Sequence, residues 1–305
     1  MPALATMPAI SLAAVAGRRN RTLELATEAE ARGFSGIYCP SMGDGLGLCE
    51  ALAFATKRIP FGTTIANIYA RHPYDYAQTA ALIHEVSGGR FRFGIGVSHG
   101  PMNARLGADT GKPLADIRAF AGRLREVEQQ TGPQPPLVLA TLRQKMVELA
   151  SAIAQGAVWA NAACSHMAAS LAHLTPAQRD DPAFMVANMV PTCIAEDREA
   201  AANVMRRTLA SYVALPNYQN YWIEAGYREE MAAIKAALAA GKREQIAGLM
   251  TDRWLSDVTL FGTAAEVRAG VERWHAAGVN TLILVPSSAA GGQLQAFEEL
   301  FAAFT

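Results

Sequence analysis

The chain has 305 residues, of which 51% are hydrophobic, so it can form one large α/β barrel or two average domains. Its 27 basic and 27 acidic side chains balance, and no basic run occurs, which argues against nucleic acid or an anionic membrane as partner. A small-molecule substrate is therefore the expected partner.

The chain shows no sign of export or of membrane insertion. Residues 1–16 are apolar, but Arg18, Arg19 and Arg21 follow them, whereas a secretory signal carries its basic residues first. No apolar run reaches the ~18 residues that a membrane-spanning helix needs. The four cysteines share no C-x-x-C spacing, which argues against a zinc site or a disulfide framework. We therefore expect a cytoplasmic protein without a metal site.

Short apolar runs alternate with helical patterns along the whole chain, which predicts parallel strands. The uninterrupted run Leu137–Thr141 is typical of a strand buried on both faces. Eight strands are expected, at residues 9–13, 34–39, 59–65, 91–98, 137–141, 156–160, 184–194 and 279–285. Helices are expected at residues 22–32, 48–56, 73–86, 113–130, 143–154, from 196 onward and at 263–277.

Eight alternating strands favour a single (β/α)8 TIM barrel that spans residues 1–305, with a doubly wound open sheet as the alternative. The regular alternation lapses at about residues 215–257, where a mostly helical insertion is expected before the last βα unit. Tyr218, Tyr221 and Trp222 in this insertion line a substrate cavity or, more simply, form the packing face of a helix.

The stretch Ile59–Gly100 predicts one strand, helix, strand unit with unusual loops after both strands. Pro73 suits the first position of the helix, because its fixed φ fits there and its missing N–H would have no partner. In the second strand Gly94, Gly96 and Ser98 share the face opposite the bulky residues. The two glycines leave room beside the backbone, where a flat ligand can lie.

Three segments of this unit resemble the luciferase-like group of flavin-dependent and deazaflavin (F420)-dependent oxidoreductases. They are the strand end Phe61–Ile65, the Arg-His-Pro turn Asn67–Pro73, and the run Ser87–Gly100, which reads SGGR and then GxGVSH. The turn and the GxGVSH run are most similar to the deazaflavin branch. The resemblance implies a TIM barrel that binds F420 and moves hydride between it and a small organic substrate.

The resemblance also implies which residues bind the cofactor ring. In the family the third strand ends in a bulge with a non-prolyl cis peptide, and the matching bond here is Thr64–Ile65, so Ile65 would support the ring. Asn67 would hydrogen-bond the polar edge of the ring, although asparagine in a turn more often bonds its own backbone. Ring-lining residues of the fourth strand would be Gly94, Gly96, Val97 and Ser98.

The cofactor's phosphate is expected near the loop after strand five. Thr141 begins this loop, and Arg143 and Lys145 accompany the N-terminus of the next helix, where free N–H groups favour an anion. Two basic side chains that simply face solvent are the alternative. The family places the phosphate around this loop and the sixth strand, which supports the anion site.

His99 and Ser41 are the catalytic candidates. His99 follows the glycine-containing strand, and imidazole can act as acid or base near neutral pH, although a lone histidine is more often structural. Sugar-phosphate dehydrogenases that resemble this chain have a histidine after strand two and a glutamate after strand four. Here Ser41 and His99 occupy those regions, which argues against a sugar phosphate as substrate.

Other interpretations stay open. Gly94 and Gly96 also begin a dinucleotide fingerprint, but no helix is expected where the pyrophosphate would need one. An FMN-dependent two-component monooxygenase, fed by a separate cofactor reductase, is the main rival to F420 chemistry, and a non-catalytic flavin-binding relative is another. The resemblance further implies a homodimer.

Overall fold

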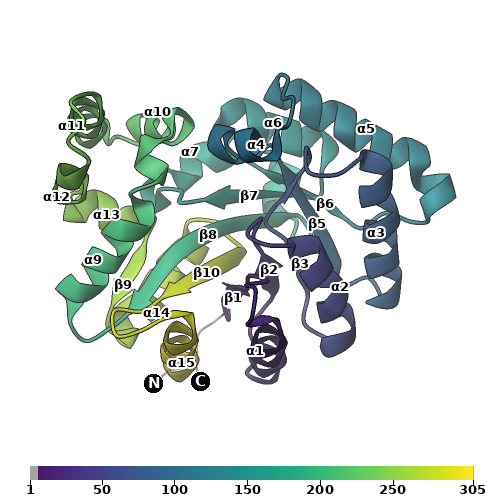
Figure 1. The fold of residues 1–305 in the computed structure, drawn as a ribbon, viewed down its shortest axis with the longest axis horizontal. Coiled ribbons are helices and arrows are strands. Elements are labelled where there is room, and N and C mark those ends of the chain that lie inside the picture. The colour runs from purple at the N-terminus through teal and green to yellow at the C-terminus, as the bar shows by residue number, and fades with distance from the viewer. Residues whose placement is uncertain (1–5, 305) are drawn as a thin grey trace.

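Apolar runs of the chain form one closed sheet in the computed structural model, which describes residues 6–304. The eight barrel strands are β1 (Ala9–Ser11), β2 (Ile37–Cys39), β3 (Phe61–Thr63), β5 (Phe91–Gly96), β6 (Leu137–Ala140), β7 (Gly156–Ala160), β8 (Met185–Ile194) and β10 (Thr281–Ser287). β10 pairs in parallel with both β1 and β8, which closes the barrel (Figure 1). The (β/α)8 TIM barrel is therefore confirmed, and the open sheet is wrong.

Two short strands extend the barrel beyond the expected set. β4 (Ala66–Asn67) pairs with β5 after a bulge that interrupts the third expected strand at Thr63. β9 (Leu260–Gly262) pairs with the C-terminal end of β8. Both lie at the end of the barrel where the strands finish.

Helices pack around the outside of the barrel and over its two ends (Figure 1). They are α1 (Arg19–Ala31), α2 (Gly45–Ala55), α3 (Pro73–Val86), α4 (Gly100–Leu106), α5 (Pro113–Thr131), α6 (Gln144–Ile153), α7 (Met167–Leu171), α8 (Pro176–Asp180), α9 (Arg198–Leu209), α14 (Ala264–Ala276) and α15 (Gln293–Ala303). α5 shows why such a helix packs against the barrel. Its apolar residues Ile117, Phe120, Leu124 and Val127 recur at helical spacing and are buried on one face. α14 begins with a capping box between Thr263 and Glu266.

The segment at residues 215–257 is mostly helical, as expected. It contains α10 (Pro216–Glu224), α11 (Arg228–Ala239), α12 (Ile246–Leu249) and α13 (Asp252–Val258). Trp222 and Trp254 are completely buried, with ring centroids 4.9 Å apart. Tyr218 and Tyr221 are buried as well, so the aromatic rings of α10 pack inside the protein, and the ring of Tyr218 also lies beside His99.

Two apolar cores hold the fold together. The larger lies between the strands and the helices and includes Phe91, Phe93 and Ile95, the bulky face of β5. The smaller core fills the inside of the barrel, and its members are Ala9, Tyr38, Val138, Val158, Met185, Ala187 and Ile283. Ile65 packs against this inner core.

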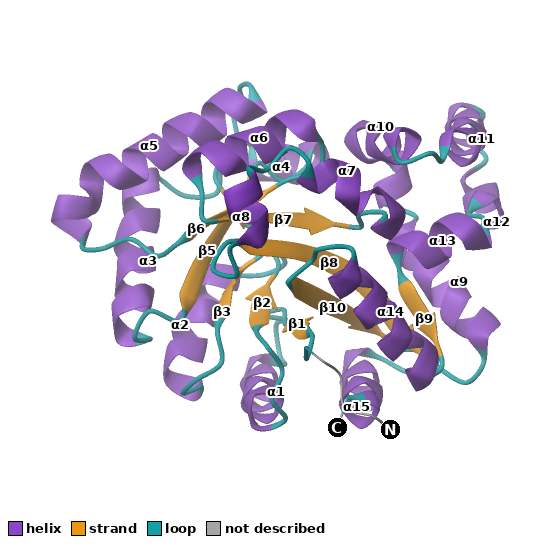
Figure 2. Ribbon diagram, turned by 180° about the vertical axis from the view of Figure 1, so that it is seen from behind, coloured by secondary structure: helices purple, strands orange, loops and turns teal. Residues whose placement is uncertain are grey.

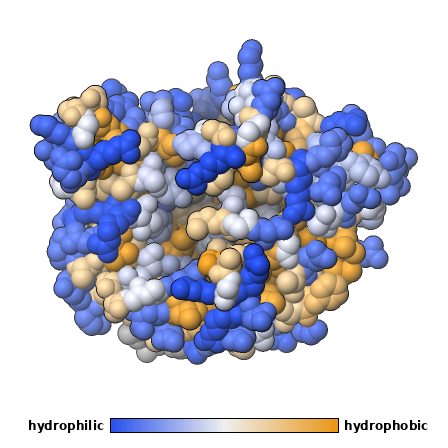
Figure 3. Space-filling view, in the orientation of Figure 1, coloured by the Kyte–Doolittle hydropathy of each residue, from blue (hydrophilic) through white to orange (hydrophobic). Residues whose placement is uncertain are grey.

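The two ends of the barrel differ in what covers them. α8, which precedes β8, lies in front at the N-terminal end of the strands (Figure 2). α4 and α10 lie at the opposite end, which faces the viewer in Figure 1 and is hollowed near its centre in Figure 3. In TIM barrels this C-terminal end carries the active site. None of the helices in residues 6–304 is long and apolar enough to cross a membrane.

Candidate active site

The bulge after β3 matches the sequence-based expectation. The Thr64–Ile65 peptide bond is cis, as the resemblance implies. The Thr64 amide donates to the Cys39 carbonyl oxygen at 2.7 Å, whereas its buried hydroxyl has no hydrogen-bond partner among the described residues. A buried hydroxyl in this state costs about 1–3 kcal/mol unless a ligand or water satisfies it. The bulge therefore offers a hydrogen-bonding group beside the apolar side chain of Ile65.

Gly94 and Gly96 do not leave the open space that the sequence predicts beside β5. A Cβ atom at Gly94 would lie 1.9 Å from the Thr63 carbonyl oxygen, and one at Gly96 would lie 2.8 Å from the Ala140 Cβ atom and 3.1 Å from Ile65. The glycines therefore allow the bulge to approach β5. A planar ligand has to lie beyond the bulge, so these glycines would act on it through Thr63 and Ile65.

Asn67 and Val97 belong to a polar network at the ends of β4 and β5. Asn67 Oδ1 accepts from the Tyr69 amide at 3.2 Å, and Asn67 Nδ2 donates to Asn103 Oδ1 at 2.9 Å. Asn103 Nδ2 donates in turn to the Val97 carbonyl oxygen at 2.9 Å. Asn67 thus bonds the backbone of its own turn, the simpler of its two expected roles, and its contact with a ring edge stays a prediction.

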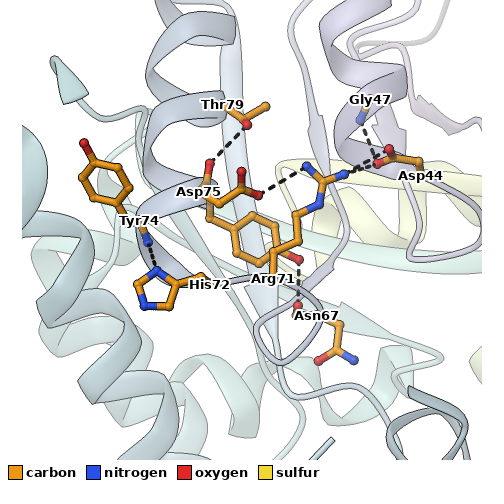
Figure 4. Close-up of polar contacts among 9 residues, drawn as sticks. Asp44, Gly47, Asn67, Arg71, His72, Tyr74, Asp75 and Thr79 are labelled. Atoms are coloured by element: carbon orange, nitrogen blue, oxygen red, sulfur yellow. Dashed lines mark hydrogen bonds and ion pairs between the residues drawn. The ribbon is translucent and has the colours of Figure 1, made fainter. Parts of the chain in front are cut away.

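The Arg-His-Pro turn is held by its own polar contacts (Figure 4). His72 Nδ1 accepts from the Tyr74 amide at 3.2 Å and so caps α3. The Arg71 guanidinium lies between Asp44 and Asp75, at 3.0 and 3.8 Å. The turn therefore joins the loop after β2 to the start of α3, and His72 caps that helix.

His99 lies partly buried at the end of β5, between two tyrosines of the β8–β9 connection. Its ring centroid is 6.3 Å from that of Tyr212 and 5.7 Å from that of Tyr218. Burial lowers the pKa of His99 below its ordinary value, so the ring is neutral at pH 7. Ser98 has a φ of 56°, a left-handed conformation that concentrates at functional sites when the residue is not glycine. A neutral imidazole in this position can accept a proton.

The structure corrects two sequence-based expectations about this end of the barrel. A helix, α4, does begin at Gly100 directly after His99, so it is the closed barrel that excludes a dinucleotide-binding fold. Ser41 is exposed in the loop after β2, and no hydrogen bond within residues 6–304 joins it to His99. The structure therefore does not pair the two catalytic candidates.

Sequence reasoning missed Asn161, the residue directly after β7. Asn161 has a φ of 56°, and its buried Nδ2 atom has no hydrogen-bond partner in the described part of the chain. Its carbonyl oxygen accepts from Trp222 Nε1 at 3.1 Å. Burial raises the pKa values of Tyr212 and Tyr218, and the nearby Asn161 amide opposes this rise. A polar residue directly after a barrel strand is the signal that points to Asn161.

At the expected phosphate site, one of the two basic side chains already pairs with a carboxylate of the protein. Thr141 is buried, and its amide donates to the Val158 carbonyl oxygen at 2.8 Å. Arg143 pairs through two of its nitrogens with Glu224 of α10, 81 residues further along the chain, and its Nε–Oε1 distance is 2.9 Å. Lys145 is exposed in the first turn of α6. Anion binding by Arg143 and Lys145 stays a prediction, and an anion would compete with Glu224.

The side chains at the C-terminal end fit a ligand with hydrogen-bonding groups. Thr64 Oγ1 after β3 and Asn161 Nδ2 after β7 are buried without partners, and such atoms in native proteins are usually satisfied by a ligand or water. No group of three or more His, Cys, Asp or Glu side chains in residues 6–304 is placed to hold a metal ion. A planar cofactor with polar edges, together with a polar substrate beside it, suits these residues.

Known proteins resemble this chain along most of its length. A Mycobacterium tuberculosis protein, provisionally named a coenzyme F420-dependent oxidoreductase, is 24% identical over 318 residues, which cover 87% of this chain and 90% of that protein. The coenzyme F420-dependent tetrahydromethanopterin reductase from Methanopyrus kandleri superposes with a TM-score of 0.76 and 19% identity, over 97% and 98% of the two chains.

A flavin enzyme shares the fold as well. The oxygenating component of 3,6-diketocamphane monooxygenase from Pseudomonas putida, in complex with FMN, superposes with a TM-score of 0.63 and 14% identity, over 97% and 96% of the chains. The model of the luciferase-like monooxygenase family matches residues 4–281. With that match over most of its length, and with the barrel that the resemblance implies, the chain belongs to the luciferase-like monooxygenase family of oxidoreductases.

Proposed function

We propose that the protein is an F420-dependent oxidoreductase that transfers hydride between the deazaflavin and a small organic substrate. The observation that carries this proposal is the buried, unpartnered Thr64 Oγ1 beside Ile65, in the bulge at the C-terminal end of the barrel. It suits a hydrogen-bonding edge of a planar ring. The Mycobacterium tuberculosis and Methanopyrus kandleri relatives are both named for F420, which supports a deazaflavin.

In this proposal each residue has a separate task. Ile65 supports the back of the ring, and the Thr64 hydroxyl hydrogen-bonds to it. The bound cofactor supplies the hydride acceptor or donor. His99, neutral because it is partly buried, accepts the proton that leaves a substrate hydroxyl group as hydride departs. The barrel contributes mainly by positioning ring and substrate face to face.

Titration of the protein with F420 and with FMN, followed by absorbance, tests the cofactor. We expect saturable binding of F420 and substrate-dependent oxidation or reduction of it, with no oxygen consumed. Submicromolar binding of FMN without binding of F420 would overturn the assignment. An oxygen electrode run on the same samples separates hydride transfer from monooxygenation.

The FMN-bound monooxygenase among the similar structures favours one alternative. In that case the protein would be the oxygenating part of a two-component monooxygenase and would receive reduced FMN from a separate reductase. It would then consume oxygen together with substrate, which a deazaflavin reaction does not. A non-catalytic flavin-binding relative would bind cofactor yet show no substrate-dependent change in its spectrum.

We also propose that the protein forms a homodimer through α2 and α3. Phe54 on α2 is 63% exposed, and Leu82 and Val86, one turn apart on α3, are 48% and 38% exposed. Figure 3 shows hydrophobic side chains over these helices at the lower right. An exposed apolar patch of this kind is typical of a protein interface. Light scattering should give the mass of a dimer, and Phe54→Glu should give monomers, whereas a monomeric wild type would contradict the proposal.

A further inference from the structure

Four side chains from separate parts of the chain meet at the C-terminal end of the barrel. His99 follows β5, Asn161 follows β7, Tyr212 lies in a 3-10 helix at 212–214, and Tyr218 lies in α10. The ring centroids of Tyr212 and Tyr218 are 5.2 Å apart, and both lie within 6.3 Å of the His99 centroid. Asn161 and Tyr218 are only 3% and 5% exposed. We refer to these four residues as the mouth cluster.

The mouth cluster offers hydrogen bonds without a fixed charge. Asn161 Nδ2 is a buried donor with no hydrogen-bond partner among the described residues, and the Asn161 side chain lies near the Tyr212 and Tyr218 hydroxyls, where it opposes the rise of their pKa values. Burial keeps both tyrosine hydroxyls protonated, because it raises their pKa values, and keeps His99 neutral, because it lowers the pKa of that ring. No Asp, Glu, Lys or Arg side chain contributes to any of these three shifts. A charged group bound here would therefore lose its hydration without gaining a counter-ion.

We propose that Asn161, Tyr212 and Tyr218 form the binding subsite for an uncharged hydroxyl or carbonyl oxygen of the substrate, which makes small neutral alcohols and ketones the substrate class. This inference rests on the proposed function. In the oxidative direction the C–H bond gives its hydride to oxidised F420, the O–H bond gives its proton to His99, and the carbon–oxygen double bond forms. The three donors hold the oxygen while these bonds break, and they discriminate against substrates that lack it.

The matched variants are Asn161→Ala, Tyr218→Phe and Tyr221→Phe. Tyr218→Phe removes one hydroxyl but keeps the ring that contacts Trp222 with centroids 5.4 Å apart. Tyr221 is the control, since it lies in the same helix and is also buried, but its hydroxyl accepts from the Ala163 amide at 3.1 Å, outside the mouth cluster. Folding of every variant is checked by thermal unfolding.

Binding is measured first without cofactor, by saturation-transfer NMR with acetone, cyclohexanone and acetophenone, and with glucose 6-phosphate as the anionic comparator. We expect wild type and Tyr221→Phe to contact at least one ketone. Asn161→Ala and Tyr218→Phe should weaken that contact about tenfold, the usual effect of one lost hydrogen bond. Turnover of cyclohexanol with oxidised F420 should fall to a similar extent, while the Kd for F420 stays within about twofold.

Two results would overturn the subsite. One is equal ketone contact in wild type and in both cluster variants. The other is contact with glucose 6-phosphate but with none of the three ketones. Failure of F420 to bind would overturn the proposed function instead, and the cofactor-free NMR measurement would still decide the subsite.

Discussion

The two sides of the barrel mouth are built in different ways. The bulge side comes from one continuous stretch, residues 59–103, in which the chain folds back on itself through the Asn67, Asn103 and Val97 contacts. The insertion side is assembled from distant segments, because Asn161 meets Trp222 and Arg143 meets Glu224. The comparison teaches that a short, self-contained unit forms the proposed cofactor side, whereas tertiary packing forms the proposed substrate side.

The two sides also differ in their packing and in their hydrogen bonding. Beside Gly94 even one added carbon atom meets backbone at 1.9 Å, so the bulge side tolerates no increase in volume. On the insertion side the donor Asn161 Nδ2 is buried without a partner among the described residues. Added volume on the bulge side should therefore affect folding first, whereas loss of a polar group at the barrel mouth should affect ligand binding or catalysis first.

Gly94→Ala tests the tight side and should have the largest effect. The new Cβ atom would collide with the Thr63 carbonyl oxygen, and backbone cannot yield as a flexible side chain can. We expect the free energy of unfolding to fall by about 3 kcal/mol or more, measured by urea denaturation. Gly122→Ala in α5 is the control, because nothing lies within 4 Å of its added carbon, and it should gain about 1 kcal/mol. Equal stability of the Gly94→Ala and Gly122→Ala variants would contradict the tight packing of the bulge side.

His99→Gln tests the contact between the two sides, because His99 belongs to the stretch 59–103 but its ring lies against Tyr212 and Tyr218, and activity should change more than stability. Loss of the proton acceptor should lower kcat/KM about 100-fold, while F420 still binds. Burial lowers the pKa of His99, so the base stays neutral until the pH falls below 6.5, and activity should decline only below that value. The variant should no longer show this decline at acidic pH. His72→Gln, which alters only a helix cap, should keep both the wild-type rate and the decline at acidic pH.

The same contrast explains what the sequence could predict. The eight strands and the cis bond at Thr64–Ile65 follow from local patterns and from a contiguous motif, so they were predictable. The glycine positions were recognised, but their neighbours Thr63 and Ala140 depend on strand pairing that the sequence alone does not give. Partners 81 residues apart, such as Arg143 and Glu224, have no local signal at all.

Thr64→Val separates ligand binding from folding on the bulge side. The Thr64 hydroxyl has no partner among the described residues, and valine has nearly the same shape. Removal of an unpaired buried hydroxyl should keep or raise stability, by up to about 1 kcal/mol. If the hydroxyl serves the cofactor, the Kd for F420 should rise about tenfold. Unchanged F420 affinity, measured by absorbance titration, would remove Thr64 from the cofactor site.

Glu224→Gln should have the smallest effect, and it tests the ion pair that links the insertion to the loop after β6. Both side chains are more than 40% exposed, so the pair contributes less than about 1 kcal/mol, and unfolding should change little. The variant frees Arg143 for a phosphate group, and the Kd for F420 should fall about threefold. Glu199→Gln, which instead breaks the pair between the exposed Glu199 and Arg206, should leave that Kd unchanged. If freeing Arg143 weakens F420 binding, the pair orders the loop for the cofactor rather than competing with it.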